Sequence, residues 1–150
     1  MKKFRFSLET VLDYKQQALD ALRAEHGAIL ARVRAQEEVV DGLEEEHRQV
    51  DAEFTRRKLE GLTVLDALNY EQYLRALERE IQEERYKLEQ LRRQEDQKRA
   101  QVVEARKETA TIEKLKEHKL EDYRKAEQKD EEQRIEEFVS NTRALAGADI

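Results

Sequence analysis

The feature that most constrains this chain is an apolar repeat with alternating steps of four and three residues, which runs from Leu8 to Arg57. Ten of its fifteen positions are apolar. The positions are Leu8, Leu12, Lys15, Leu19, Leu22, His26, Ile29, Val33, Gln36, Val40, Leu43, His47, Val50, Phe54 and Arg57. A period of 3.5 residues is typical of a helix that winds left-handed around a second helix. Since the chain has no proline and only four glycines, little in it interrupts a helix, and the repeat predicts one over about residues 7–59.

A second repeat of the same period covers residues 74–112, and eight of its twelve positions are apolar. The positions are Leu74, Leu77, Ile81, Glu84, Leu88, Leu91, Glu95, Lys98, Val102, Ala105, Thr109 and Ile112. This repeat predicts a second helix over about residues 70–143. Beyond it the positions in step are Lys116, Lys119 and Tyr123, so we expect looser packing there.

Between the repeats the sequence carries signals for a bend. Gly61 can adopt the left-handed conformation that ends a helix, and Thr63 with Asp66 resembles a capping box that starts one. Asn69 offers a second start by the same logic. These signals predict a bend over about residues 60–69.

Two apolar seams of similar length joined by a short break predict an all-α fold, a long antiparallel two-helix coiled-coil hairpin that forms a single domain over residues 1–150. The alternative is one long helix that pairs in parallel with a second copy, as a generic coiled-coil homodimeric scaffold. The two start signals in the break favour the hairpin, which predicts a monomer.

The composition argues against catalysis. Charged residues make up 43% of the chain and cysteine is absent, so thiolate nucleophiles and cysteine zinc sites are excluded. No zinc-protease, phosphate-loop or serine-hydrolase motif occurs, and we expect no enzyme, cofactor or metal. His26 and His47 lie three heptads apart on the first seam, where polar residues usually set register.

Charge and hydropathy also limit which partners the protein can bind and where in the cell it is expected. Residues 36–53 hold eight carboxylates and one arginine, whereas residues 91–125 hold eleven Lys/Arg and eight Asp/Glu. Such runs usually form solvated faces, although they could orient a charged partner. A helical nucleic-acid-binding protein stays an alternative, but a net charge of -6 gives no reason to expect it. No apolar run is long enough to insert in a membrane and the start lacks a secretory signal, so we expect a cytoplasmic protein.

Aromatic and aliphatic residues gather off the seams at both ends of the predicted hairpin. Such groups either close the end of a coiled coil or serve as anchors for a binding partner. The terminal group is Phe4, Phe6, Tyr14, Leu120 and Tyr123, and the bend group is Leu62, Leu65, Leu68, Tyr70 and Tyr73.

Two stretches resemble the flagellar export protein FliJ family. The first is the opening Phe-x-Phe-x-Leu-x-x-Val-Leu, residues 4–12. The second begins with Glu-Lys-Leu-x-Glu at residue 113 and continues to the Tyr123-Arg124 pair and an acidic run. Leu74 with its neighbour Tyr73 is also similar to the family, and the chain length and the predicted hairpin layout fit the family throughout.

The resemblance implies a non-enzymatic part of the bacterial flagellar type III export apparatus. Proteins of this family are understood to act as the central stalk of the hexameric export ATPase, to promote its assembly and activity, and to link it to the membrane export gate. They are also linked to export chaperones. We would then expect a cytoplasmic protein at the inner-membrane face of the flagellar base, with no nucleic-acid partner and no inserted segment.

On this hypothesis each end of the hairpin binds one partner. The residues expected to contact the ATPase are Phe4, Arg5, Phe6, Leu8, Leu120, Tyr123 and Arg124. The residues expected to contact the gate, on the bend side, are Tyr70, Tyr73 and Leu77.

Overall fold

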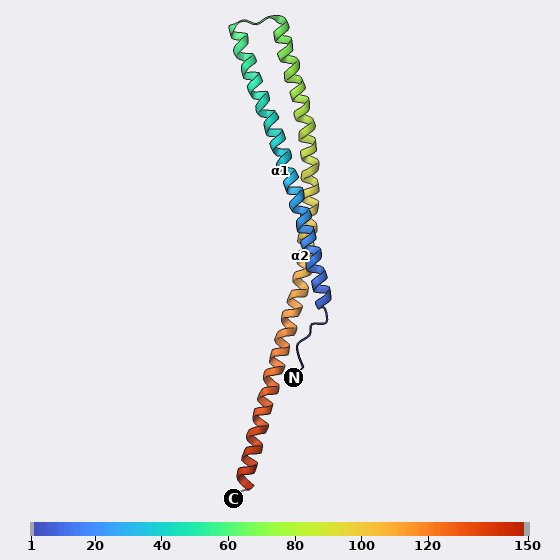
Figure 1. Ribbon diagram of the computed structural model, residues 1–150, viewed down its shortest axis with the longest axis vertical. Helices are drawn as coiled ribbons and strands as arrows, with labels where there is room; N and C mark the ends of the chain where they lie inside the picture. The colour runs from blue at the N-terminus through green and yellow to red at the C-terminus, as the bar shows by residue number, and fades with distance from the viewer. Residues whose placement is uncertain (1, 149–150) are drawn as a thin grey trace. The chain divides into compact units, whose positions relative to one another are not determined.

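Residues 2–148, which the computed structural model of the chain describes, form two α-helices (Figure 1). Helix α1 spans Glu9–Glu60 and helix α2 spans Val64–Ala148. The described residues divide into two compact units. The bend unit holds residues 20–103, and the terminal unit holds residues 2–19 with 104–148.

In the bend unit, α2 runs back alongside α1 from the short link that joins them (Figure 1). Side-chain hydrogen bonds define the direction. Tyr70 bonds to Glu53, Glu84 to Gln36 and Glu95 to His26. The residue number falls on α1 as it rises on α2, so the helices are antiparallel. The predicted helical hairpin is confirmed.

In the terminal unit, the first part of α1 also pairs with α2 in antiparallel orientation. Lys15 Nζ donates to Glu108 Oε2 at 2.9 Å, and Gln16 Nε2 donates to Glu113 Oε1 at 3.2 Å. Further along α2, Lys116 Nζ donates to Glu9 Oε1 at 2.9 Å. These bonds place the start of α1 beside the middle part of α2.

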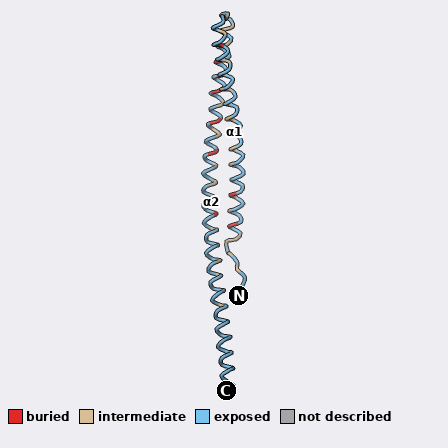
Figure 2. The backbone as a smooth tube through the Cα atoms, turned by 90° about the vertical axis from the view of Figure 1, so that its left-hand side faces the viewer, coloured by how far each residue is buried: buried red, intermediate tan, exposed pale blue. Residues whose placement is uncertain are grey.

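The apolar seams form the contact between the helices. All fifteen positions of the first predicted repeat and all twelve of the second are buried or half-buried, and Figure 2 shows that most other residues of both helices are exposed. The buried apolar side chains of the described residues are Leu12, Leu19, Val33, Val40, Phe54, Leu74, Leu77, Ile81 and Leu88. One helix covers only one face of the other, and no described side chain is completely buried.

Beyond Ile112 the seam continues differently from the prediction. Lys116 and Tyr123 are half-buried as the repeat implies, but Leu120 is half-buried in place of the exposed Lys119. A step of four therefore replaces a step of three, which brings an aliphatic side chain rather than a lysine to the seam. From residue 131 to 147 every residue of α2 is exposed.

The link is shorter than the predicted bend of residues 60–69. Gly61 has a φ of 100°, and Thr63 Oγ1 accepts a hydrogen bond from the Asp66 N–H at 3.2 Å. This cap starts α2 at Val64 instead of near residue 70, so Asn69 lies inside the helix. The first start signal is sufficient because the link already reverses the chain by residue 63.

The helix ends also differ by a few residues from the predicted ones. The hydrogen bond from the Leu12 N–H to the Leu8 carbonyl, at 2.8 Å, begins α1 at Glu9 rather than near residue 7. Helix α2 continues to Ala148 and passes through Gly147. A single glycine lowers helix propensity but does not by itself break a helix.

We predict opposite effects of alanine at two glycines. Gly61→Ala should lower the unfolding free energy by about 1 kcal/mol, because a side chain disfavours a positive φ. Gly42→Ala, inside α1, should raise it by roughly 0.5–1 kcal/mol, because alanine is the better helix former. An added Cβ meets no atom within 4 Å at either position, so the comparison isolates the backbone. Chemical denaturation followed by circular dichroism measures both, and equal effects would contradict the account of the link.

Candidate functional site

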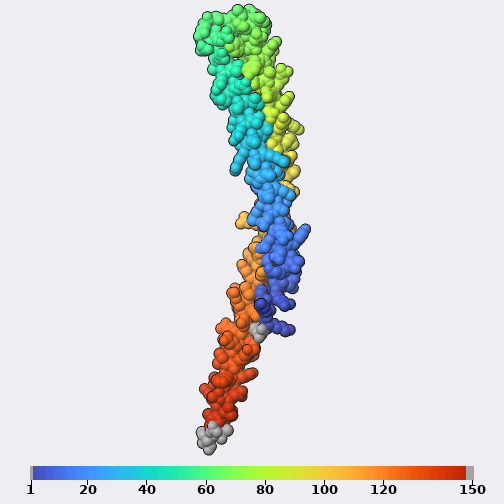
Figure 3. Space-filling model, viewed as in Figure 1, coloured from blue at the N-terminus to red at the C-terminus, as the bar shows by residue number. Residues whose placement is uncertain are grey.

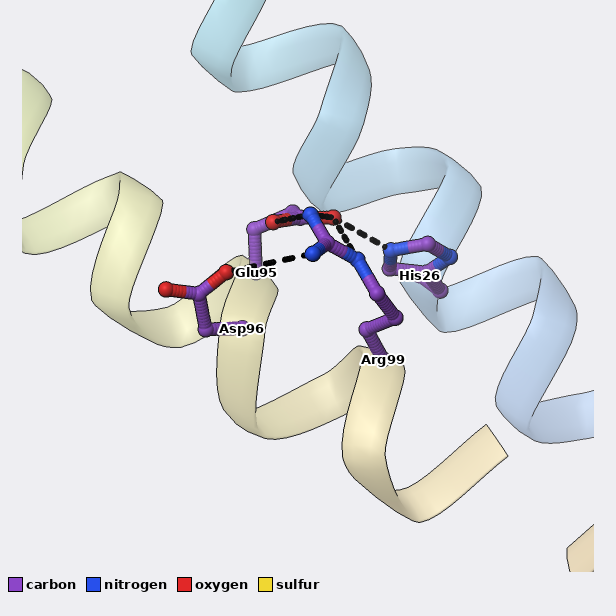
Figure 4. A network of polar contacts seen from close by, with 4 residues as sticks. All are labelled: His26, Glu95, Asp96 and Arg99. Atoms are coloured by element: carbon purple, nitrogen blue, oxygen red, sulfur yellow. Dashed lines mark hydrogen bonds and ion pairs between the residues drawn. The ribbon is translucent and has the colours of Figure 1, made fainter. Parts of the chain in front are cut away.

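A buried carboxylate lies in the seam of the bend unit, where Figure 4 shows it between two basic side chains. Glu95 on α2 is 6% exposed. His26 Nε2 on α1 donates to Glu95 Oε1 at 2.8 Å. From the next turn of α2, Arg99 Nε donates to the same oxygen at 3.0 Å, and Arg99 Nη1 lies 3.5 Å from Asp96 Oδ1. The carboxylate is therefore tied to both helices at once.

The charges around Glu95 favour its ionised form. The hydrogen bond from Arg99, followed by the one from His26, holds the pKa of the Glu95 carboxyl below its ordinary value. Glu84, another seam carboxylate, has its pKa lowered by hydrogen bonds from Gln36 and Lys87. Within the described chain no buried side-chain nitrogen or oxygen lacks a partner, so the polar seam positions are satisfied.

Cross-helix ion pairs join the two helices of the bend unit at three positions. Lys98 contacts Glu25 at 2.8 Å and Arg92 contacts Glu37 at 3.4 Å, and Arg85 bonds to Glu44. Two carboxylates of the acidic stretch, Glu37 and Glu44, thus pair with arginines of α2. Individually such exposed pairs contribute little stability, but together they favour the observed register.

The predicted terminal group gathers in the terminal unit. Phe4 packs on Tyr123 with ring centroids 5.5 Å apart and ring planes 53° apart. The Tyr123 hydroxyl donates to the Lys2 carbonyl oxygen at 2.5 Å, so it holds the segment before α1 against α2. Of this group Phe4, Phe6, Leu120 and Tyr123 are half-buried, whereas Tyr14 is exposed. Of the other residues expected to contact the ATPase, Leu8 is half-buried, and Arg5 and Arg124 are exposed.

At the bend, Tyr70 closes the end of the coiled coil. Its ring stacks on Phe54 with centroids 5.0 Å apart and planes 23° apart. Arg57 Nη1 donates to the Tyr70 hydroxyl oxygen at 2.9 Å, and that hydroxyl donates to Glu53 Oε1 at 3.2 Å. Tyr70 is therefore half-buried and engaged with α1.

Tyr73 is the more accessible tyrosine, with 45% of its surface exposed. Its hydroxyl donates to the Glu46 carboxylate, and this bond raises the pKa of Tyr73. With Tyr70 it lines a shallow groove of about 360 Å³ across the two helices.

The structure contradicts the expectation that Leu77 is a surface anchor. Leu77 is 4% exposed and belongs to the core. Three residues after the buried Leu74, it lies on the same helix face and points at α1. Substitution here would test stability rather than partner binding.

Two sets of apolar side chains off the seams are strongly exposed, and of these only Leu65 and Leu68 belong to the predicted bend group. Around the link Leu59, Val64, Leu65 and Leu68 are between 48% and 85% exposed. A second set, Ile135, Phe138, Val139 and Leu145, lies on the last turns of α2. The second set also falls off the 3.5-residue repeat, so extending the search for off-seam residues past Tyr123 would have found it.

Over the described residues, no three His, Asp or Glu side chains are grouped closely enough to hold a metal ion. Neither helix, over the same residues, contains a stretch apolar enough to cross a bilayer.

We predict that Glu95 stabilises the hairpin in a pH-dependent way. Because its folded pKa lies below the ordinary value of 4.5, its contribution is present above pH 4.5 and is lost as the pH falls through the folded value. Glu95→Gln should lower the unfolding free energy at pH 7, and the gap to the unsubstituted protein should close below pH 4.5. Glu104→Gln, at an exposed position, is the control. Denaturation across this pH range checks the prediction, and a gap that stays constant would contradict it.

When the sequence is compared with known protein families, one family profile matches it. The sequence profile of the family described as Flagellar FliJ protein matches residues 4–146. Neither the curated proteins nor the solved structures contain a match. Since the family profile covers nearly the whole chain, the resemblance carried by its two ends is confirmed, and the chain belongs to the flagellar FliJ protein family.

Proposed function

We propose that this component of flagellar protein export acts, without catalysis of its own, as the central stalk of the hexameric export ATPase. In this proposal the stalk promotes assembly and activity of the hexamer and links it to the export gate. It works at the cytoplasmic face of the inner membrane at the flagellar base, and export chaperones are a further class of partner.

The observation that carries the proposal is the aromatic junction of the terminal unit. Phe4 on Tyr123, with the Tyr123 hydroxyl bonded to the Lys2 carbonyl, makes one surface from the start of the chain and the middle of α2. The exposed Arg5 and Arg124 lie next to these rings in the sequence. Aromatic and arginine side chains are the types most enriched at binding hot spots.

The dimensions of a helix pair support the same role. Each helix is about 10–12 Å across with its side chains, so a pair is roughly 20 Å wide. Such a pair is narrow enough for the central hole of a ring. A protein of this kind can act on the ring only by binding its conformations unequally.

The bend unit is proposed to contact the export gate. Tyr73 is its accessible aromatic anchor, and the exposed Leu65 and Leu68 extend the surface. Tyr70, which is stacked on Phe54 of α1, packs beneath this surface as part of the closed end of the coiled coil. Leu77 does not belong to the proposed gate-binding surface, because it is buried against α1.

The competing hypothesis, a parallel homodimeric scaffold, requires an open seam. A second copy would have to cover the face of α1 that Val40 and its neighbours present. That face is covered by α2 of the same chain, around Leu88 and Leu91. The hairpin therefore leaves no seam for a parallel partner in this region.

We predict that the aromatic junction is needed for action on the ATPase. Adding the unsubstituted protein to the purified export ATPase should stimulate ATP hydrolysis, and the double variant Phe4→Ala with Tyr123→Ala should lose most of that stimulation. The matched control is Tyr14→Ala, because Tyr14 is an aromatic of the same unit that is 68% exposed. Circular dichroism should show equal helix content in all three proteins.

Two results would count against the proposal. Absence of stimulation by the unsubstituted protein contradicts the stalk role itself. Equal loss of stimulation in the Tyr14 control would show that the effect is not specific to the junction.

A further inference from the structure

The two flanks of the seam differ in charge within the bend unit. On one flank Glu37 and Glu44, each of which follows a seam position of α1 by one residue, pair with Arg92 and Arg85 of α2. Residues that flank a coiled-coil seam usually meet the opposite charge in this way. The other flank does not follow this pattern.

The other flank carries carboxylates on both helices. Glu46 and Glu53 on α1 each precede a seam position, and Asp66, Tyr73 and Glu80 stand one heptad apart on α2. The hydrogen bond to Glu46 raises the pKa of Tyr73, as do burial and the charges of Glu46 and Glu80. Among the described residues none of the four carboxylates is in an ion pair. This flank therefore carries negative charge that no ion pair of the hairpin neutralises.

The groove beside Tyr73 lies on this flank. Val50, Tyr70 and Tyr73 line it together with the carboxylates of Glu53 and Asp66. Figure 3 shows one face of this end of the bend unit, where the last turns of α1 and the first turns of α2, both in green, have no further element over them. The groove volume of about 360 Å³ is near the lower end of the range of roughly 300–1,000 Å³ for ligand pockets. It suits one side chain of a partner, and aromatic rings beside carboxylates attract cations.

The chain already places one guanidinium in this groove. Arg57 Nη1 donates to the Tyr70 hydroxyl oxygen at 2.9 Å, and Arg57 Cζ lies 5.5 Å from the centre of the Tyr70 ring. The bond to Tyr70, followed by the charges of Asp66 and Glu53, raises the pKa of the Arg57 guanidinium. Of the described residues that line the groove, Arg57 alone is basic, so the groove and its surroundings keep a net negative charge.

Other occupants fit this groove less well. An apolar anchor would remove Glu53 and Asp66 from water without giving them a partner, which is costly. A second copy of the chain would bring two negatively charged flanks together. Arginine fits better than lysine, because its planar guanidinium stacks on a ring while it donates to more than one carboxylate.

We propose that the groove between Tyr70 and Tyr73 receives an arginine side chain of a partner protein, held against the Tyr73 ring by Glu46 and Glu53. This inference rests on the proposed function, because the groove belongs to the surface assigned to the export gate. It adds the chemical class of the side chain that the partner presents. Arg57 then competes with the partner's arginine for the same carboxylates.

The first test uses a probe of known chemistry. Isotope-labelled full-length protein is titrated with the capped tripeptide Ala-Arg-Ala, with Ala-Gln-Ala and Ala-Leu-Ala as controls, and NMR follows the backbone amides. The arginine peptide should shift the amides of Val50, Tyr70 and Tyr73 and their neighbours, with a dissociation constant on the order of millimolar. It should bind at least about fivefold more tightly than either control peptide.

Two carboxylate variants test the charge of the groove. Glu46→Gln with Glu53→Gln keeps an acceptor for each tyrosine hydroxyl and should weaken binding of the arginine peptide about fivefold, with a smaller salt dependence. The matched control is Glu38→Gln with Asp41→Asn, which removes the same charge from exposed positions of α1 outside the groove. This control should bind within about twofold of the unsubstituted protein.

An arginine variant should have the opposite effect. Arg57→Gln removes the competing cation and should tighten binding about threefold, whereas Arg56→Gln, at the exposed neighbouring position, should have little effect. Circular dichroism should show equal helix content in all variants. If the groove served stability alone, the carboxylate and arginine variants would not change binding in opposite directions.

Three results would overturn the inference. The first is an arginine peptide that shifts the groove amides no more than the glutamine peptide does. The second is tighter binding of the leucine peptide, which would make the groove an apolar anchor site. The third is a shift of the same amides with protein concentration in the absence of peptide, which would assign the groove to a second copy of the chain.

A separate titration with the purified cytoplasmic domain of the export gate distinguishes this inference from the proposed function. If that domain does not bind the unsubstituted protein, the gate contact fails, and the peptide titration still decides the chemistry of the groove. If the domain binds and neither the carboxylate nor the Arg57 variant changes its affinity, the gate contact stands and the arginine assignment is overturned.

Discussion

The structure depends on the contact between the two apolar seams. Each helix is covered on one face only, and that cover is the other helix of the same chain. Val33, Val40 and Leu88 form a buried cluster, and Ile29 and Leu91 pack against it. Nothing else shields these side chains from water in the described part of the chain, so the hydrophobic gain of this contact holds the helices together. The helix propensity of a charge-rich sequence then needs only to keep each helix continuous.

Polar residues within the seam give the contact its direction and register. Glu95 is acceptable in a buried position because Arg99 and His26 bond to it from both helices, whereas a shift of one helix by one turn would remove His26 and leave the buried carboxylate with a partner on its own helix only. A pair of helices fixed in this way presents its outer surfaces at constant positions. That is what a stalk needs, since it can act only through the surfaces that it offers to other proteins.

The sequence predicted the pairing well because a 3.5-residue period reports directly which face of a helix is covered. It predicted the link less well. Thr63 and Asn69 offer similar start signals, and only the geometry of the reversal selects Thr63. Leu77 was placed correctly on the second seam, but it was also expected to contact the gate, and a side chain covered by α1 is not accessible to a partner. The exposed apolar residues around Phe138 were missed because the off-seam residues were sought only at the two ends of the predicted hairpin, and this segment lies past Tyr123, the last seam position considered.

The most direct test of the hairpin is a distance between spin labels at Gln16→Cys and Glu113→Cys, in a chain with no native cysteine. The native side chains are hydrogen-bonded at 3.2 Å, so the labels should lie within about 20 Å of each other. That short distance should persist when labelled protein is diluted with unlabelled protein, because both labels are on one chain. A single continuous helix would separate them by roughly 145 Å, and that result would contradict the hairpin and the functions inferred from it.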